Sequence, residues 1–318
     1  MTPFVKLLAT PLALLVALMF SPIEQHRGRS KSSDFATTTR LVSASTSMQT
    51  AWEVPKNPLV DSLTNSSYLT EQIRWGFRIF TNTPQEAPKF SGNKMSCSNC
   101  HLNAGQRERA LPIVGVAGVY PEYNKRSGRL FSLEDRIVGC LMRSQNATGT
   151  PATPAESEDL LPITSKEVLA LSAYISWLSS GYPVGKNMPW RGQNVIPSNK
   201  LVPLEKLDAK RGEALFMEKC TSCHGEDGQG VDIGDKKAGP LWGSDSWNDG
   251  AGAARIYTLA GMIRYSMPYL DPGSLTDEEA QQIAAFINSK PRPVFPYKQN
   301  DYRTEPLPVD AVYYTRQK

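Results

Sequence analysis

The sequence predicts a mainly α-helical protein built from two tandem domains of one type. Two observations support this fold class. The chain has 318 residues, 40% of them hydrophobic and 21% charged, which provides enough apolar material for two soluble cores. The motif Cys-x-x-Cys-His occurs twice, beginning at Cys97 and at Cys220, and similar helical patterns flank each copy. The net charge of +4, from 35 basic and 31 acidic residues, is too small to indicate a nucleic-acid partner.

The N-terminal residues indicate export. Residues 7–20, LLATPLALLVALMF, form an apolar run with the length of a signal-peptide core, shorter than most membrane-spanning helices. Residues 1–23 are therefore expected to direct the chain to the periplasm. One alternative is that this segment stays uncleaved as an inner-membrane anchor, because most nearby basic residues follow the run. Membrane contact is expected only in that case. A buried helix is the other alternative. The Ser/Thr-rich residues 24–50 are expected to form a flexible tether.

Each motif lies between two predicted helices, so the chain repeats itself. Upstream of the motifs, Gly76-Phe-Arg-Ile-Phe and Gly212-Glu-Ala-Leu-Phe share one spacing of glycine, aliphatic residue and phenylalanine. Downstream, EVLALSAYISWL and TDEEAQQIAAFINS each place apolar residues on one helical face. Thr276 and Glu279 fit a capping box at the start of the last helix, and Pro291 ends it. The first half differs by an insertion around TPQEAPKFSGNKM.

A cluster of prolines, glycines and polar residues between the two helical patterns predicts a domain boundary. We predict an N-terminal domain over residues 51–185, a linker over 186–203 and a C-terminal domain over 204–290. The Pro-rich residues 291–318 are predicted to form an extended tail over a domain surface.

Cys-x-x-Cys-His is the attachment motif of c-type haem, in which two thiols bond the porphyrin and the imidazole ligates iron. A zinc site is disfavoured because neither half supplies four ligands, and a thioredoxin-like pair because no strand–helix–strand pattern surrounds the motifs. We therefore predict two class I cytochrome c-like domains with two covalently bound haem c groups. The attachment residues are Cys97, Cys100, Cys220 and Cys223, and the proximal ligands are His101 and His224.

The distal iron ligands must be sulfur, lysine, water or nothing, because the remaining histidine lies in the tether. In the second half Met267 stands in a Met-Pro pair before the closing helix, a position that favours it over Met262 and Met217. Trp242 and Trp247 are expected to pack on this haem.

The corresponding position of the first half holds Cys140, the one cysteine outside the two motifs. Met142 lies two residues further on and would give a second His/Met haem. A buried, inert thiol is the third interpretation of Cys140. Spacing alone leaves these alternatives open.

Four further motifs bear on function, namely Trp52-Glu-Val-Pro55, Gly92 to Gly105 around the first haem motif, Tyr120-Pro121 with Tyr123, and Glu134 to Asn146 around Cys140. Through these motifs, residues about 51–290 resemble the thiosulfate dehydrogenase family of dihaem cytochromes c. The resemblance implies that thiosulfate is coupled to tetrathionate, in some members preferentially in reverse, at a catalytic haem with His101/Cys140 ligation. Ala147-Thr148 departs from the family, which usually has glycine directly after the asparagine.

The chemistry agrees with this resemblance. Coupling two thiosulfates releases two electrons, which two haems can hold. Thiolate ligation lowers the potential of the first haem and methionine raises that of the second, so electrons are expected to pass onward to a small cytochrome c or another redox protein. Two dianions repel each other, so fixed cations are needed, and Arg109 and Arg143 are the predicted substrate contacts. The alternative is that these arginines pair with haem propionates or acidic neighbours.

Three other functions remain open. A pure electron-transfer cytochrome would use Met142 and Met267 as distal ligands and leave Cys140 inert. A Sox-type cytochrome would attach thiosulfate to a partner protein's cysteine. A dihaem peroxidase is less favoured because no spare histidine lies within either domain.

Overall fold

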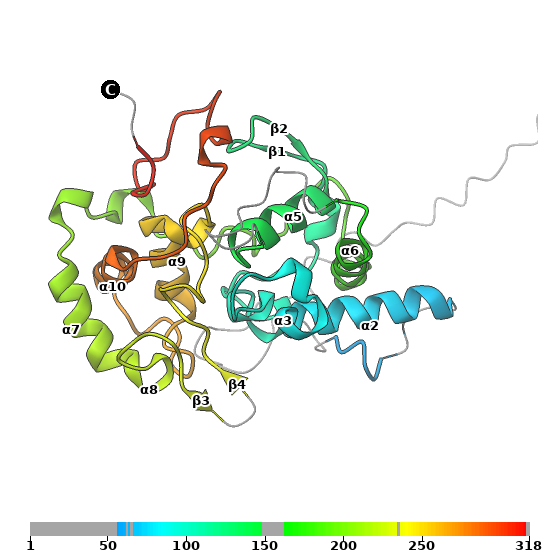
Figure 1. Ribbon diagram of the computed structural model, residues 1–318, viewed down its shortest axis with the longest axis horizontal. Coiled ribbons are helices and arrows are strands. Elements are labelled where there is room, and N and C mark those ends of the chain that lie inside the picture. The colour runs from blue at the N-terminus through cyan, green and yellow to red at the C-terminus, as the bar shows by residue number, and fades with distance from the viewer. Residues whose placement is uncertain (1–55, 62, 64–65, 148–161, 234–235, 316–318) are drawn as a thin grey trace, which may run out of the picture. The chain divides into compact units, whose positions relative to one another are not determined.

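The computed structural model describes residues 56–61, 63, 66–147, 162–233 and 236–315 (Figure 1). The predicted signal peptide or anchor, the tether and the Trp52–Pro55 motif lie outside these residues. The described residues form helices joined by long irregular segments and two short strand pairs. No helix in these ranges has the length and apolar character needed to cross a membrane.

The first half of the fold runs from α2 to α6. Its α-helices are α2 (Ser67–Thr81), α3 (Thr83–Glu86), α4 (Leu102–Gly105), α5 (Leu133–Arg143) and α6 (Lys166–Leu178). The 3₁₀ helices are η1 (Pro88–Phe90), η2 (Cys97–Asn99) and η3 (Val116–Val119). Strand β1 (Glu122–Asn124) pairs antiparallel with β2 (Arg129–Phe131). The insertion predicted from the repeat forms α3 and η1.

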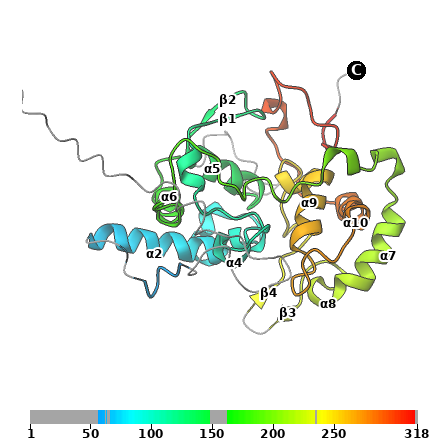
Figure 2. The same cartoon turned by 180° about the vertical axis from the view of Figure 1, so that it is seen from behind.

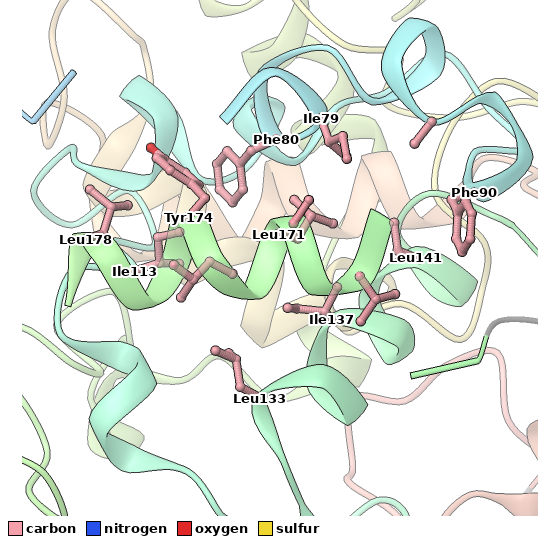
Figure 3. Close-up of a cluster of buried hydrophobic side chains, with 14 of the residues drawn as sticks. Ile79, Phe80, Phe90, Ile113, Leu133, Ile137, Leu141, Leu171, Tyr174 and Leu178 are labelled. Carbon is pink, nitrogen blue, oxygen red and sulfur yellow. The ribbon is translucent and has the colours of Figure 1, made fainter. Parts of the chain in front are cut away.

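Helix α2 packs across α6 at a glycine. The Ser66 side chain caps α2 by accepting a hydrogen bond from the Leu69 backbone N–H, and the helix buries Ile73, Gly76, Ile79 and Phe80. A Cβ on Gly76 would lie 1.9 Å from the carbonyl oxygen of Ala170 in α6, so only glycine permits this approach. Figure 3 shows Leu171 of α6 between side chains of α2 and of α5, and Tyr174 of α6 beside Phe80 of α2.

The second half runs from α7 to α10 and repeats this contact. Its α-helices are α7 (Ala209–Lys219), α8 (Thr221–His224), α9 (Ile256–Ser266) and α10 (Asp277–Ser289), with the short strands β3 (Asp232–Ile233) and β4 (Lys236–Lys237). The remaining 3₁₀ helices are η4 (Ser198–Lys200), η5 (Leu204–Lys206), η6 (Gly252–Ala254) and η7 (Lys298–Asn300).

Helix α10 lies between α7 and α9 (Figure 2). A Cβ on Gly212 of α7 would lie 2.0 Å from the Gln282 carbonyl oxygen of α10, so the two halves share one helix crossing. Thr276 and Glu279 form the predicted capping box at the start of α10. The internal repeat and the faces predicted for the two closing helices are confirmed.

The two halves belong to one unit of the chain, Leu41–Lys318, and polar contacts join them. The Asn248 side-chain amide donates to the Met142 carbonyl oxygen at 2.9 Å, and the Asn93 amide donates to the Ser246 carbonyl oxygen at 3.2 Å. Met95, which is 3% exposed, belongs to the core of the second half although it precedes the first haem motif. The first haem motif is therefore anchored against the second half.

Candidate haem sites and the cavity beside Cys140

The first Cys-x-x-Cys-His motif folds as a tight turn that fixes its histidine. Cys97 begins η2, and the Asn99 side-chain oxygen accepts the Ser96 backbone N–H at 2.6 Å. His101 Nδ1 lies 2.6 Å from the Leu111 carbonyl oxygen, so Nδ1 carries the proton and Nε2 is left for a metal. Burial lowers the pKa of His101, which keeps the imidazole neutral.

The motif lines a cavity of about 410 Å³. Cys97, Cys100 and His101 line it together with Cys140, and apolar side chains such as Phe80 contribute most of the remaining surface. Burial raises the pKa of Cys97 to about 12 and that of Cys100 to about 11, and both thiols are close enough to Cys140 to interact with it electrostatically. All five cysteines lie in the described residues and none forms a disulfide.

These residues fit a covalently attached haem. Three free thiols and a neutral histidine with one nitrogen available line one largely apolar cavity. Trp247 lines the same cavity, and its indole Nε1 is buried without a hydrogen-bond partner among the described residues. A buried donor of this kind fits a bound group that carries acceptors, as the propionates of haem do.

Cys140 reaches the cavity because of its position on α5. Ser132 and Asp135 form a capping box that starts this helix. Ile137 and Leu141 belong to the core, and together with Cys140 they line the cavity. Met142, the alternative ligand, is 6% exposed, belongs to the core cluster and is absent from the described lining of this cavity. The Cys140 thiol, and not the Met142 thioether, therefore lines the cavity together with His101.

Arg136 is the cation beside Cys140, and it was not singled out from the sequence. It precedes Cys140 by one helical turn, and its exposed side chain lines the haem cavity. The charge of Cys140 is the main cause that raises the pKa of Arg136, followed by opposing desolvation and by Tyr120. Among the described residues none forms a salt bridge with Arg136. The signal for this role was its spacing of four residues from Cys140 on a predicted helix.

A basic groove adjoins the cavity and shares Arg136 with it. The hairpin β1–β2, α5 and the C-terminal segment form this groove, which has a volume of about 1160 Å³. Its basic lining residues are Lys125, Arg126, Arg129, Arg136, Arg143, Arg255 and Arg303, and its acidic ones are Glu122, Asp135, Asp301 and Glu305. Because cations outnumber carboxylates, the groove favours anions.

Several of the groove's cations already have partners. Asp135 pairs with Arg129 at 2.9 Å, and its pKa is lowered mainly by that hydrogen bond. Arg126 instead donates to the Gly250 carbonyl oxygen at 2.6 Å and to Tyr302, so no described carboxylate neutralises it. The surplus of positive charge therefore comes from Arg126 and Arg136 together with Lys125 and Arg303, which form no salt bridge among the described residues.

Of the two predicted substrate contacts, Arg143 lines the basic groove, whereas Arg109 lines neither the groove nor the haem cavity. Arg143 makes two hydrogen bonds to Asp301, at 2.7 and 2.8 Å, and packs 3.9 Å from the Phe295 ring centre. Arg109 lies 3.6 Å from Glu108 and 5.7 Å from the Tyr265 ring centre. Neither is among the residues that line the haem cavity. Their contact with substrate stays a prediction to which this geometry adds no support.

The second motif has the same arrangement in the second half. Cys220 is the C-cap of α7, and the next four residues form α8 with His224 at its end. Burial lowers the pKa of His224. Met267 follows α9, donates its N–H to the Ile263 carbonyl oxygen and packs on the same core cluster as Cys220. Its rival Met217 is 40% exposed on α7.

The two tryptophans expected at the second haem differ. Trp242 contacts Phe216 and Phe286 inside the second half, at ring distances of 5.4 and 5.7 Å. Trp247 is buried in the same core, yet it also lines the cavity of the first half. A residue of the second half therefore forms part of the wall of the first site.

Comparison with known proteins agrees with this architecture. Residues 87–184 match the family described as "SoxA/TsdA, cytochrome c domain", and residues 207–287 match "Cytochrome C oxidase, cbb3-type, subunit III". The predicted fold class, mainly α with two tandem cytochrome c domains, is confirmed, and the protein carries two haem c groups.

Two curated relatives are named thiosulfate dehydrogenase. The protein of Stutzerimonas stutzeri is 39% identical over 71% of this chain and 69% of its own length. That of Allochromatium vinosum is 39% identical over 71% of this chain and 80% of its own. A solved thiosulfate dehydrogenase (TsdBA) from Marichromatium purpuratum aligns with a TM-score of 0.65 and 34% identity, covering 74% of this chain, which spans 48% of that longer chain. The chain therefore belongs to the thiosulfate dehydrogenase family of dihaem cytochromes c.

Proposed function

We propose that this chain couples two thiosulfates to tetrathionate at Cys140 and passes the two electrons through both haems to an acceptor. The observation that carries the proposal is the cavity that Cys140 lines together with Cys97, Cys100 and His101 and that shares Arg136 with the basic groove. The chain is an oxidoreductase of the periplasm, and a small cytochrome c or similar redox protein takes up its electrons.

The first haem would be held by Cys97, Cys100 and His101, with Cys140 as distal ligand. The second would be held by Cys220, Cys223 and His224, with Met267 as distal ligand. When bound, the two haems supply one-electron acceptors, and thiolate against methionine ligation sets the first at lower potential than the second.

The sulfur of Cys140 can act as a covalent carrier. Its thiolate and the outer sulfur of one thiosulfate form an S–S bond with the loss of two electrons. The outer sulfur of a second thiosulfate then attacks that bonded sulfur, forms the central S–S bond of tetrathionate and releases the Cys140 thiolate. Atoms and charge balance, and the reverse sequence would reduce tetrathionate.

Arg136 and the groove offset the repulsion between the two dianions. Arg136 lies beside Cys140 without a salt-bridge partner among the described residues, so its guanidinium is available to a sulfonate group. The groove extends this positive potential outward through Arg126 and raises the local concentration of substrate.

The activity itself is tested by incubating the purified holoprotein with thiosulfate and an artificial electron acceptor. Tetrathionate should appear with one molecule formed for each two electrons transferred. Reduction of both haems by other donors with no tetrathionate formed would favour the pure electron-transfer function instead.

Replacing Arg136 by glutamine is expected to weaken thiosulfate use. A hydrogen bond to a charged group contributes about 1.5–3 kcal/mol, which corresponds to a fall in kcat/KM of about ten- to a hundredfold. The fall should lessen in Arg136→Lys, which keeps the charge. Lys166→Gln removes an exposed cation outside the groove and should have wild-type kinetics. Equal kinetics for Arg136→Gln and Lys166→Gln would exclude Arg136 from substrate binding.

Replacing Met267 by alanine is expected to change the second haem alone. The variant should lose any near-infrared methionine–iron charge-transfer band, and the potential of the second haem should fall because the thioether that raises it is gone. Redox titration of the two haems checks both effects. A band that persists would assign the ligand to Met262, and a wild type that lacks the band would point to a lysine.

A further inference from the structure

A residue of the first half holds the loop that carries Met267. This loop runs from the end of α9 to the start of α10. Within it, the carbonyl oxygen of Tyr269 accepts a hydrogen bond of 2.6 Å from Arg107 Nη2. The Arg107 guanidinium also lies over the Tyr269 ring, 4.1 Å from its centre. Both contacts are made two residues after Met267.

The Arg107 side chain is buried in the protein interior. It is 5% exposed, and burial is the main cause that lowers its pKa, although an arginine remains charged. No salt bridge to Arg107 occurs among the described residues, and its Nη1 has no hydrogen-bond partner there. The contacts with Tyr269 are thus the main interactions of a buried cation, and opening the loop would break both.

The segment that presents Arg107 is also tied to the first haem site. It begins at His101, whose Nδ1 bonds to the Leu111 carbonyl oxygen at 2.6 Å. Four non-glycine residues of this segment have positive φ, namely Asn103 at 53°, Ala104 at 52°, Arg109 at 57° and Leu111 at 53°. L-residues adopt this conformation only where their surroundings impose it. The segment therefore presents Arg107 in a fixed position.

The second half anchors the other end of the same loop by its own residue. Arg264 donates from Nη1 to the Gly273 carbonyl oxygen at 2.8 Å and from Nε to Asp277 at 2.7 Å. The loop is thus held near its end by the second half and near Met267 by the first half.

We propose that Arg107 is a positioning residue for Met267. From the first half of the fold, Arg107 holds the distal loop of the second haem site closed. The proposal rests on the assignment of Met267 as distal ligand. A hydrogen bond to a charged group together with a cation–π contact resists displacement of this loop. An external ligand that competes with Met267 for iron must therefore act against Arg107.

The test measures imidazole binding to the oxidised holoprotein. Binding is monitored by the loss of the methionine–iron band, because this band reports the second haem alone. Arg107→Gln should bind imidazole at this haem about tenfold or more tightly than the wild type. Arg107→Lys should fall between the two, because it keeps the cation but not the planar fork. Arg74→Gln is the matched control, because Arg74 also donates to a backbone carbonyl oxygen, that of Pro58 in the first half, at 3.1 Å. The imidazole affinity of this variant should equal that of the wild type.

A second variant covers the case in which Arg107→Gln fails to fold. Tyr269→Leu removes the partly exposed ring and leaves the carbonyl oxygen, so a rise of about two- to fivefold in imidazole affinity is expected. Wild-type affinity in Tyr269→Leu and in any folded Arg107→Gln would overturn the positioning role. A band that survives in Met267→Ala would overturn the ligand assignment as well, which separates the two failures.

Discussion

Tetrathionate formation by Cys140→Ser is expected to fall by about a thousandfold or more, with both haems still attached. Removal of a covalent nucleophile abolishes the step that it performs, and an alkoxide is a poorer ligand for iron and a poorer leaving group than a thiolate. Serine is nearly isosteric, so the cavity should keep its shape. The measurements are tetrathionate production with an artificial acceptor, haem content, and low-temperature electron paramagnetic resonance, in which the thiolate signal should disappear.

Met142→Leu provides the matched control. Met142 is buried in the core of the first half, and Met/Leu exchange preserves volume, so tetrathionate formation and the thiolate signal should stay close to wild type. The opposite result in both variants, an active Cys140→Ser and an altered Met142→Leu spectrum, would make Met142 the ligand and the chain an electron carrier.

Gly76→Ala is expected to destabilise the protein by about 3 kcal/mol or more. A Cβ at this position would lie 1.9 Å from the Ala170 carbonyl oxygen and 2.6 Å from its carbonyl carbon, both backbone atoms of α6. Relief requires α2 and α6 to separate, which opens the core around Tyr174. Gly212→Ala should have a similar effect in the second half, where the Cβ would lie 2.0 Å from the Gln282 carbonyl oxygen. Denaturant unfolding curves measure both effects.

Gly139 of α5 supplies the control for this prediction. The nearest neighbour of a Cβ added there is the Phe131 ring at 3.9 Å, so the methyl group fits. Alanine should stabilise this helix by up to about 1 kcal/mol because it forms helix better than glycine. If Gly76→Ala and Gly139→Ala unfold at the same denaturant concentration, the helix crossing is not set by glycine.

The sequence predicted the repeated helices and the cavity-lining residues of the haem motif because both depend on local spacing. Gly76 and Gly212 occupy equal positions relative to their phenylalanines, and the structure uses both in one kind of helix crossing. Cys140 was found because its helix position follows from the register of the repeat.

The arginines could not be assigned in this way, because their partners are distant in sequence. Asp301 neutralises Arg143 across 158 residues of chain. The Tyr269 partner of Arg107 lies 162 residues away. Charge counts along the chain contain no information about such pairs. Arg136, by contrast, has a local relation to Cys140, so helical spacing alone could have favoured it.

The C-terminal segment completes the interior of the first half. Phe295 is 1% exposed and belongs to the core cluster that contains Ile73 and Tyr174, and Asp301 lies against Arg143 of α5. The buried residues of the second core, apart from Met95, lie between Ile196 and Ile287, and Tyr313 packs against them from outside. During synthesis the second core can therefore close before the ribosome has released the residues that the first core needs. The buried core of the half that is synthesised first is therefore completed last.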